Sequence, residues 1–411
     1  MMLMLLILLL LLPCMLISLQ FWEDSIHDGT RIETLTNLRY LNQTVVIAGM
    51  KKKNSKYPEY FNDKGIIYPD DRGYESRQEI GPTDNLNFFN YWKDKDLMIQ
   101  TDAFICTFYI SYCEAFLPFN KSIIYLAAHR YAIHECSQKD REKFDNILIQ
   151  TAGGKRPGKP YVFLGAMNEY DVHYINYYTG LSPILLEATA LLYGASSTIY
   201  KPIREEIIIG PSQGSHCSLA LDQLYPMAAK NNVKLGTLKG LYGTFKMQHY
   251  ADHRAVVLLP YAVHSYGISE FYANGIPMFV PSIDFMIELN CMDDWKLNCV
   301  HYCPGGYNPP KHLNSTHEFD PESQDKESQR YWLKFADFYR WPFITYFSSF
   351  EELFLKLKTA DMNEIHRNMV IENEKRLEKA HSTYKNIFEN IQPNRLVPKD
   401  YNLALQEIWN L

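Results

Sequence analysis

A group of polar residues follows the apolar run AVVLLP at residues 255–260. The group consists of His264, Ser265, Gly267, Ser269 and Glu270. A carboxylate can accept hydrogen bonds from two hydroxyls at once, and free main-chain N–H groups at the start of a helix bind phosphate. These residue types in this order suit a site for a phosphorylated ligand that also carries hydroxyl groups.

The elements around this group form half of an α/β unit. The apolar run at residues 255–260 predicts a parallel strand that is covered on both faces. Residues 269–274 predict a short helix that Gly275 ends, and residues 276–280 return to the sheet. In an open α/β sheet, ligands bind beyond the carboxyl ends of the strands, so the polar group falls where a ligand would lie.

The sequence SYGISEFYANGIPMFVPS at residues 265–282 resembles the C-terminal donor-binding motif of GT-B-fold glycosyltransferases. It places a glycine three residues before Glu270 and a Gly-x-Pro five residues after it. The resemblance implies that Glu270 binds the ribose hydroxyls of a nucleotide-sugar, and that the preceding loop and helix N-terminus meet the diphosphate. The alternative is that Glu270 is an ordinary carboxylate in the first turn of a helix, stabilised by the helix dipole.

A second strand followed by glycine occurs in IIIGPSQGSH at residues 207–216. Gly210 and Ser212 are available there to approach phosphate, although glycine and serine also make ordinary turns. We therefore count both as candidate donor-binding residues.

Candidate catalytic groups lie near the ends of strands predicted in the first half of the chain: Glu114, His129 and Asp171. His129 follows the run IIYLAA directly, and an imidazole can act as general base toward an acceptor hydroxyl in an inverting transfer. Its neighbour Arg130 could bind a diphosphate or an acidic acceptor. Alternatively, His129 is a structural residue held by hydrogen bonds under a loop, and Glu114 caps or braces a helix.

Strands and helices alternate along the rest of the chain. Buried strands are predicted at residues 44–49, 103–107, 123–127 and 161–165, and a helix is predicted at residues 168–178. A long polar segment at residues 51–85 is predicted to be a loop. We therefore predict an α/β fold in which two Rossmann-like, doubly wound domains face a cleft, as in GT-B proteins.

The predicted domain organisation has four parts. Residues 1–20 form a signal peptide or signal-anchor, and residues 30–200 form an acceptor-side domain. Residues 203–360 form a nucleotide-sugar-binding domain with an insertion at residues 291–330, and residues 361–411 form a C-terminal helical segment. Lys201-Pro202 interrupts the pattern at the boundary between the two domains.

The N-terminus, MMLMLLILLLLLPCMLISLQ, resembles a secretory signal peptide or a signal-anchor. Pro13 and Cys14 favour a cleaved signal, so we expect membrane contact only if this segment is retained. Asn-x-Ser/Thr triplets at Asn42, Asn120 and Asn314 are compatible with a lumenal protein. We expect the protein in the ER or Golgi lumen, or secreted.

Cysteines beyond the N-terminal run include a cluster at Cys291, Cys299 and Cys303, which we expect to contain a local disulfide. A zinc site with His301 is the alternative, but the cluster lacks a C-x₂-C pair. Members of the metal-dependent glycosyltransferase fold usually carry an Asp-x-Asp triplet at their donor site. We expect a metal-free donor site here, with the nucleotide-sugar as co-substrate and no other cofactor.

Composition fits a two-domain globular protein. The 411 residues suffice for two α/β domains and a targeting segment. With 41 Lys and Arg against 47 Asp and Glu, the chain has no broad basic field, so nucleic acid is not an expected partner.

The predicted function is transfer of a sugar from a nucleotide-sugar to a glycan, protein or lipid acceptor. A GT-B-fold sugar-nucleotide epimerase and a catalytically inactive, secreted carbohydrate-binding protein are the alternatives.

Overall fold

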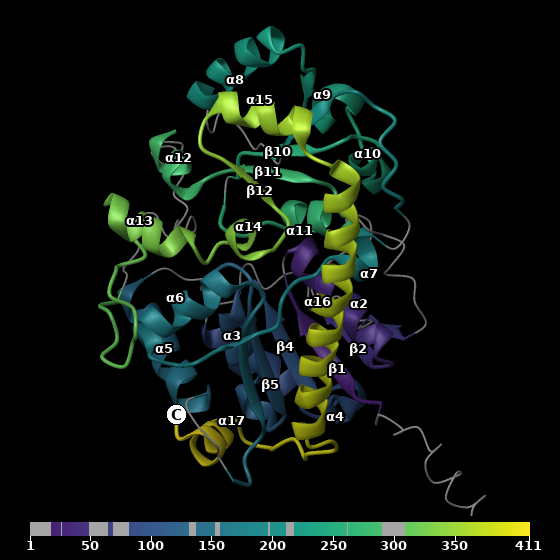
Figure 1. The fold of residues 1–411 in the computed structure, drawn as a ribbon. Helices are drawn as coiled ribbons and strands as arrows, with labels where there is room; N and C mark the ends of the chain where they lie inside the picture. The colour runs from purple at the N-terminus through teal and green to yellow at the C-terminus, as the bar shows by residue number, and fades with distance from the viewer. Residues whose placement is uncertain are drawn as a thin grey trace, which may run out of the picture.

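The computed structural model describes residues 18–25, 27–48, 65–68, 82–130, 137–152, 157–195, 198–210, 218–260, 262–289 and 309–411. Two parallel sheets with flanking helices form a lower and an upper lobe in Figure 1. Most of the predicted signal segment and the cluster at Cys291, Cys299 and Cys303 lie outside the described residues. Within the described ranges, no helix combines the length and apolar character needed to cross a membrane.

The sheet of the first domain has seven parallel strands in the order β3-β2-β1-β4-β5-β6-β7. Its strands are β1 (Gln20–Asp24), β2 (Thr44–Ala48), β3 (Ile66–Ile67), β4 (Ala103–Thr107), β5 (Ser122–Ala127), β6 (Val162–Ala166) and β7 (Ile184–Leu185). This is the doubly wound order of dinucleotide-binding folds, with the reversal between β1 and β4. The strand expected first, at residues 44–49, is the second strand, because β1 precedes it and pairs with both β2 and β4.

The helices of the first domain are α2 (Asp28–Tyr40), α3 (Pro82–Trp92), α4 (Asp96–Gln100), η5 (Ile110–Phe119), α5 (Gln138–Ala152), α6 (Glu169–Thr179) and α7 (Leu191–Gly194). Asn168 caps the start of α6 by accepting a hydrogen bond from the main-chain N–H of Asp171. Gly180 ends α6 in the left-handed region, at φ 68°, which favours glycine. A disulfide between Cys106 and Cys113 ties β4 to η5. The sequence spacing did not predict this pairing.

The sheet of the second domain has five parallel strands in the order β12-β11-β10-β8-β9. Its strands are β8 (Ile207–Gly210), β9 (Leu235–Gly236), β10 (Val256–Leu258), β11 (Met278–Pro281) and β12 (Thr345–Phe347). Its helices are α8 (Ser218–Lys230), α9 (Leu238–Tyr242), α10 (Met247–Ala251), α11 (Tyr266–Ala273), α12 (Ile283–Glu288), α13 (Lys326–Leu333), α14 (Asp337–Arg340) and α15 (Phe350–Thr359). The order reverses between β8 and β10, so this sheet is also doubly wound. Together the two sheets confirm the predicted α/β fold class.

The long helix α16 (Met362–Asn390) runs from the upper lobe to the lower lobe in Figure 1. Asn373 donates a 2.9 Å hydrogen bond to the carbonyl of Tyr272 in the second domain. Further along the helix, Nε2 of His381 lies 3.1 Å from Oδ1 of Asn37 in the first domain. The helix therefore crosses back to the first domain.

After α16, the chain continues through α17 (Tyr401–Ala404) and the π-helix η6 (Leu405–Trp409) at the base of the first domain (Figure 1). The fully buried Trp409 donates a 2.7 Å hydrogen bond to the carbonyl of Leu117 in η5. Arg395 donates hydrogen bonds to the carbonyl and side-chain oxygens of Asn120. These contacts attach the C-terminal segment to the first domain.

Candidate functional site

The carboxyl ends of the two sheets meet between the domains. In the first domain β1 leads to His27, and in the second β10 leads to Tyr266 at the start of α11. These two rings lie 5.6 Å apart, and the Tyr266 hydroxyl is 2.9 Å from the sulfur of Met167, which follows β6. The reversals in strand order therefore face each other, and such points are where doubly wound folds bind ligands.

His27 is fixed at the start of α2. Its Nδ1 accepts a 3.1 Å hydrogen bond from the main-chain N–H of Gly29, so the neutral ring carries its proton on Nε2. Burial lowers the pKa of His27, and nearby His264 lowers it further, although Asp28 opposes both. A side chain at Gly29 would come within 2.6 Å of the Tyr266 ring, so the close approach of the domains requires glycine there.

Phe108, directly after β4, lies between two imidazole rings. It stacks on His27 at 5.0 Å and on His129 at 5.4 Å, with an interplanar angle of 7° in both pairs. Phe108 has φ 66° and Arg130 has φ 57°, both in the left-handed region. Such a backbone costs a residue with a side chain roughly 1–2 kcal/mol, and strain of this kind clusters at functional sites.

In the second domain, His264 and Asp337 form a buried pair. Nδ1 of His264 hydrogen-bonds to a carboxylate oxygen of Asp337, and each side chain is 4% exposed. Burial alone would lower the pKa of His264, but the charge and hydrogen bond of Asp337, helped by Asp171, raise it above its ordinary value. Within the described residues, Nε2 of His264 is buried and has no hydrogen-bond partner.

Asp171 of α6 approaches this pair from the first domain. Its Oδ2 accepts a 2.8 Å hydrogen bond from the Asn168 amide, and the carboxylate also interacts with the main-chain N–H of Arg130. Burial raises the pKa of Asp171, although the charges of Arg130 and His264 and the Asn168 hydrogen bond lower it in part. The guanidinium of Arg130 lies over the Tyr170 ring at 5.1 Å.

The arrangement can therefore move a proton and hold an anion. A carboxylate with a raised pKa is a stronger base than an ordinary one, and Asp171 supplies it from the first domain. An imidazole with a raised pKa favours its cationic form, in which Nε2 donates a hydrogen bond, and His264 supplies it from the second domain.

The structure brings four of the candidate residues together at this interface: His129, Arg130, Asp171 and His264. Ser265 lies at the N-cap position of α11, and Ser269 in the same helix is fully buried. Gly267 lies in the first turn of α11, while Gly210 ends β8 and faces Phe271.

Of the three other candidate residues, two have partners elsewhere and one lies beyond the description. Glu270 is 1% exposed and packs against Gly194 of α7. Glu114 forms a 2.7 Å ion pair with Lys143 of α5, and its charge raises the pKa of Tyr401 of α17. These interactions connect Glu114 to α5 and to the C-terminal segment. Ser212 lies outside the described residues.

Sequence reasoning missed His27, Phe108 and Asp337. His27 follows a strand that begins at Gln20, next to the apolar N-terminal run, so the strand was not recognised. Asp337 is 73 residues from His264 and follows no predicted strand. The only sequence signal for His27 was the short apolar pair Phe21-Trp22 ahead of acidic and polar residues.

The chain contains an Asp-x-Asp triplet, Asp94-Lys95-Asp96, so the expectation of a metal-free donor site, which took this triplet to be absent, loses that ground. Its last residue opens α4, which precedes β4 in the chain. The triplet is therefore on the amino side of β4, whereas the polar group described above follows the carboxyl ends of the strands. Within the described residues, no group of three or more His, Cys, Asp or Glu side chains is placed to hold a metal ion.

No family model matches the sequence, and no curated protein matches it. Three solved structures that resemble the chain are glycosyltransferases by their descriptions. The glycotransferase of kitacinnamycin is 11% identical, with 91% of this chain and 99% of that chain covered and a TM-score of 0.43. SnogD from Streptomyces nogalater is 12% identical, with 90% and 99% covered and a TM-score of 0.38. UGT89C1 from Arabidopsis thaliana, complexed with UDP-L-rhamnose, is 11% identical, with 89% and 98% covered and a TM-score of 0.35. Likeness at these scores carries no inference about activity, and the two-domain α/β fold is established by the strand orders.

Proposed function

We propose that the protein is a glycosyltransferase that moves a sugar from a nucleotide-sugar to an acceptor hydroxyl. The observation that carries this proposal is the charge interaction between two buried groups from different domains, Asp171 of the first and His264 of the second. Asp171 is fully buried, and Nε2 of His264 is buried without a hydrogen-bond partner in the described residues, at the point where two doubly wound sheets meet. The resemblance of residues 265–282 to a donor-binding motif supports a donor site on the second domain.

In this proposal the second domain binds the donor. Glu270 holds the ribose hydroxyls, and the N-terminus of α11 meets the diphosphate with its free N–H groups. The other donor-binding residues are His264, Ser265, Gly267, Ser269, Gly210, Ser212 and Arg130.

The first domain binds the acceptor. In an inverting transfer, the acceptor hydroxyl gives its proton to the Asp171 carboxylate as its oxygen bonds to the anomeric carbon. The bond from that carbon to the diphosphate breaks, and its electron pair stays on the diphosphate oxygen. The imidazolium of His264 stabilises this oxygen by hydrogen bonding, while Asp337 orients the ring and stabilises its charge. His129 and Glu114 remain alternative bases.

We further propose the setting of the reaction. The donor site is metal-independent and uses no cofactor besides the nucleotide-sugar, and the acceptor is a glycan, protein or lipid. The apolar segment at residues 1–20 supports a place in the ER or Golgi lumen, or secretion. Membrane contact depends on whether this segment is retained, and nucleic acid is not a partner.

Turnover of a nucleotide-sugar panel tests the proposal. The purified chain is incubated with each donor, with and without sugar, peptide and lipid acceptors, and released nucleotide and sugar products are measured. We expect nucleotide release that an acceptor accelerates. An interconverted free sugar would identify the epimerase, and donor binding without any release would identify a binding protein.

A further inference from the structure

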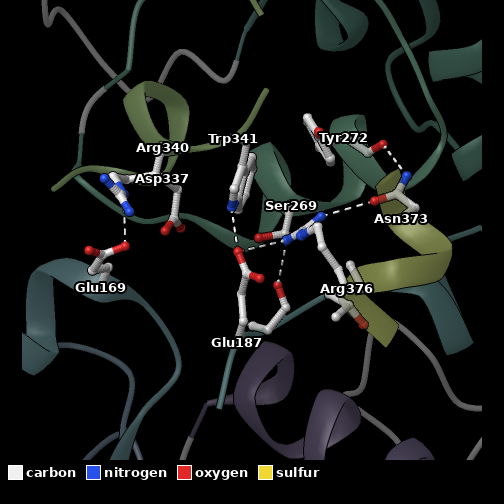
Figure 2. Close-up of polar contacts among 12 residues, drawn as sticks. Glu169, Glu187, Ser269, Tyr272, Asp337, Arg340, Trp341, Asn373 and Arg376 are labelled. Atoms are coloured by element: carbon white, nitrogen blue, oxygen red, sulfur yellow. Dashed lines mark hydrogen bonds and ion pairs between the residues drawn. The ribbon is translucent and has the colours of Figure 1, made fainter. Parts of the chain in front are cut away.

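The guanidinium of Arg376, in the crossing helix α16, is enclosed at the domain interface (Figure 2). It lies 4.8 Å from the Tyr272 ring and 4.5 Å from the Trp341 ring, and its side chain is 6% exposed. Its Nη1 donates a 2.9 Å hydrogen bond to Asn373. Its Nη2 is 3.2 Å from the carboxylate of Glu187. Two aromatic faces and an ion pair therefore hold this cation in one position.

Glu187 is held in the first domain by main-chain hydrogen bonds on either side of it. The neighbouring residues extend the pairing of β7 with β6, because Leu186 donates to the Ala166 carbonyl at 2.9 Å and Ala188 donates to the Met167 carbonyl at 3.0 Å. Arg376 also donates to the Ala188 carbonyl, at 3.4 Å. The Glu187 side chain thus offers a fixed anchor from the first domain.

Trp341 connects this anchor to the second domain. Its indole N–H donates to the Glu187 carboxylate, and its main-chain N–H donates to the carbonyl of Asp337 at 2.9 Å. Asp337 in turn holds the His264 imidazole. A short covalent and hydrogen-bonded path therefore joins Glu187 to the pair at the proposed site.

We propose that Glu187, Trp341 and Arg376 form a latch that fixes the domains at the His264–Asp337 pair and balances the charge around it. The inference deepens the proposed function, because it rests on the role of His264 there. Besides burial and the bond to His264, Glu187 raises the pKa of Asp337 and Arg376 lowers it. The charges of Asp337, Asp171 and Arg130 act on His264 itself, and the charge of His264 in turn lowers the pKa of His27.

The test is a pH titration of the His264 imidazole by NMR. The full folded chain is labelled at histidine, no donor is added, and His264→Asn assigns the signal. Loss of the negative charge in Glu187→Gln should lower the apparent pKa of the pair, and loss of the positive charge in Arg376→Gln should raise it. We expect a change of about half a pH unit or more in each. The double variant should return toward the wild type.

Arg340→Gln is the matched control, because Arg340 is in the same short helix as Asp337 and also bridges the domains. Its 2.7 Å ion pair with Glu169 is half exposed on the Arg340 side, so solvent screens its charge and the titration should stay unchanged. Figure 2 shows this pair beside the latch.

If the apparent pKa shifts in the same direction in both single variants, the proposal is overturned, because simple loosening of the interface would shift the pKa alike in both. So would an unchanged titration in both, or an equal shift in the control. If Arg376→Gln does not fold, Glu187→Gln decides alone, and a titration that is unchanged or raised contradicts the latch. Because no donor is used, absence of transferase activity would not affect the result.

Discussion

Asp171 and His264 are buried polar residues, and Nε2 of His264 has no hydrogen-bond partner in the described chain. A buried polar atom left without a partner costs about 1–3 kcal/mol. Burial also disfavours the charged form of Asp171, so both residues are retained at the expense of stability. The two residues lie in different domains, Asp171 in α6 of the first and His264 after β10 of the second. The residue types were predictable, but their pairing across the interface was not.

Asp171→Asn should lower turnover by ~10²- to 10⁴-fold and leave donor affinity nearly unchanged, because an amide cannot accept the acceptor proton. The melting temperature should stay equal or rise, since burial disfavours the charged carboxylate. Turnover, donor affinity and melting are measured on one preparation. Glu114→Gln changes the other candidate carboxylate, and it should turn over normally if Asp171 is the base. A loss of turnover in His129→Ala, with a normal Asp171→Asn, would make His129 the base.

Glu270→Ala should weaken donor binding by roughly 1.5–3 kcal/mol, because it removes a charged acceptor of hydrogen bonds. Calorimetric titration of the folded variant with a nucleotide-sugar measures the change. Glu270 packs on Gly194, so circular dichroism must first show that the variant is folded. Unchanged affinity in a folded variant would remove the ribose assignment.

At the scale of single elements, apolar runs predicted strands well. The run at residues 103–107 matches β4, and the helix expected at residues 168–178 matches α6 within a residue at each end. Both were readable because a buried parallel strand is continuously apolar and because Asn168 is a strong N-cap. β1 was missed because its residues QFWED end in two acids, whose burial depends on tertiary partners.

The contact between β1 and α2 should make stability depend on pH. Burial raises the pKa of Glu23 to about 7, although its 2.9 Å ion pair with Arg31 opposes the shift. Between pH 4.5 and 7 the folded chain holds a proton that the unfolded chain has released. Stability should therefore fall as pH rises through this window, by up to about 1.4 kcal/mol per unit. Urea unfolding across that range measures how the free energy of unfolding changes with pH, and this slope should flatten in Glu23→Gln. An equal slope in the wild type and in the variant would contradict the prediction.

The turn after β4 should favour glycine at position 108. Ordinarily alanine is more stabilising than glycine, but the φ of 66° at Phe108 disfavours any side chain. The free energy of unfolding of Phe108→Gly should therefore be about 1 kcal/mol higher than that of Phe108→Ala. Both variants lose the stacked ring, so the comparison isolates the backbone. The opposite order would show that the left-handed conformation is not kept.

At the scale of the whole molecule, two features could not be read from the sequence. Local patterns predicted α16 as a helix, but its contacts with both domains depend on how the domains sit together. The His264–Asp337 pair spans 73 residues, and no spacing rule links side chains so far apart. Periodicity reports local burial, whereas these contacts depend on the packing of distant segments.

The C-terminal segment should contribute strongly to the stability of the first domain. Trp409 is 1% exposed and bonded to η5, so Trp409→Ala should lower the free energy of unfolding by about 3–5 kcal/mol. Leu396, 83% exposed in the same segment, is the control, and Leu396→Ala should change it by less than about 0.5 kcal/mol. Guanidinium unfolding measures both. Similar small losses in the two variants would show that this segment is not firmly docked.

The most direct test of the central claim is a thermal-shift screen of the folded chain against nucleotide-sugars. A ligand that binds only the folded state stabilises it by about 2.7 kcal/mol at a hundredfold excess over Kd. We predict that at least one nucleotide-sugar raises the melting temperature, and that Glu270→Ala reduces this rise. The absence of a response to every nucleotide and nucleotide-sugar would contradict the proposed function.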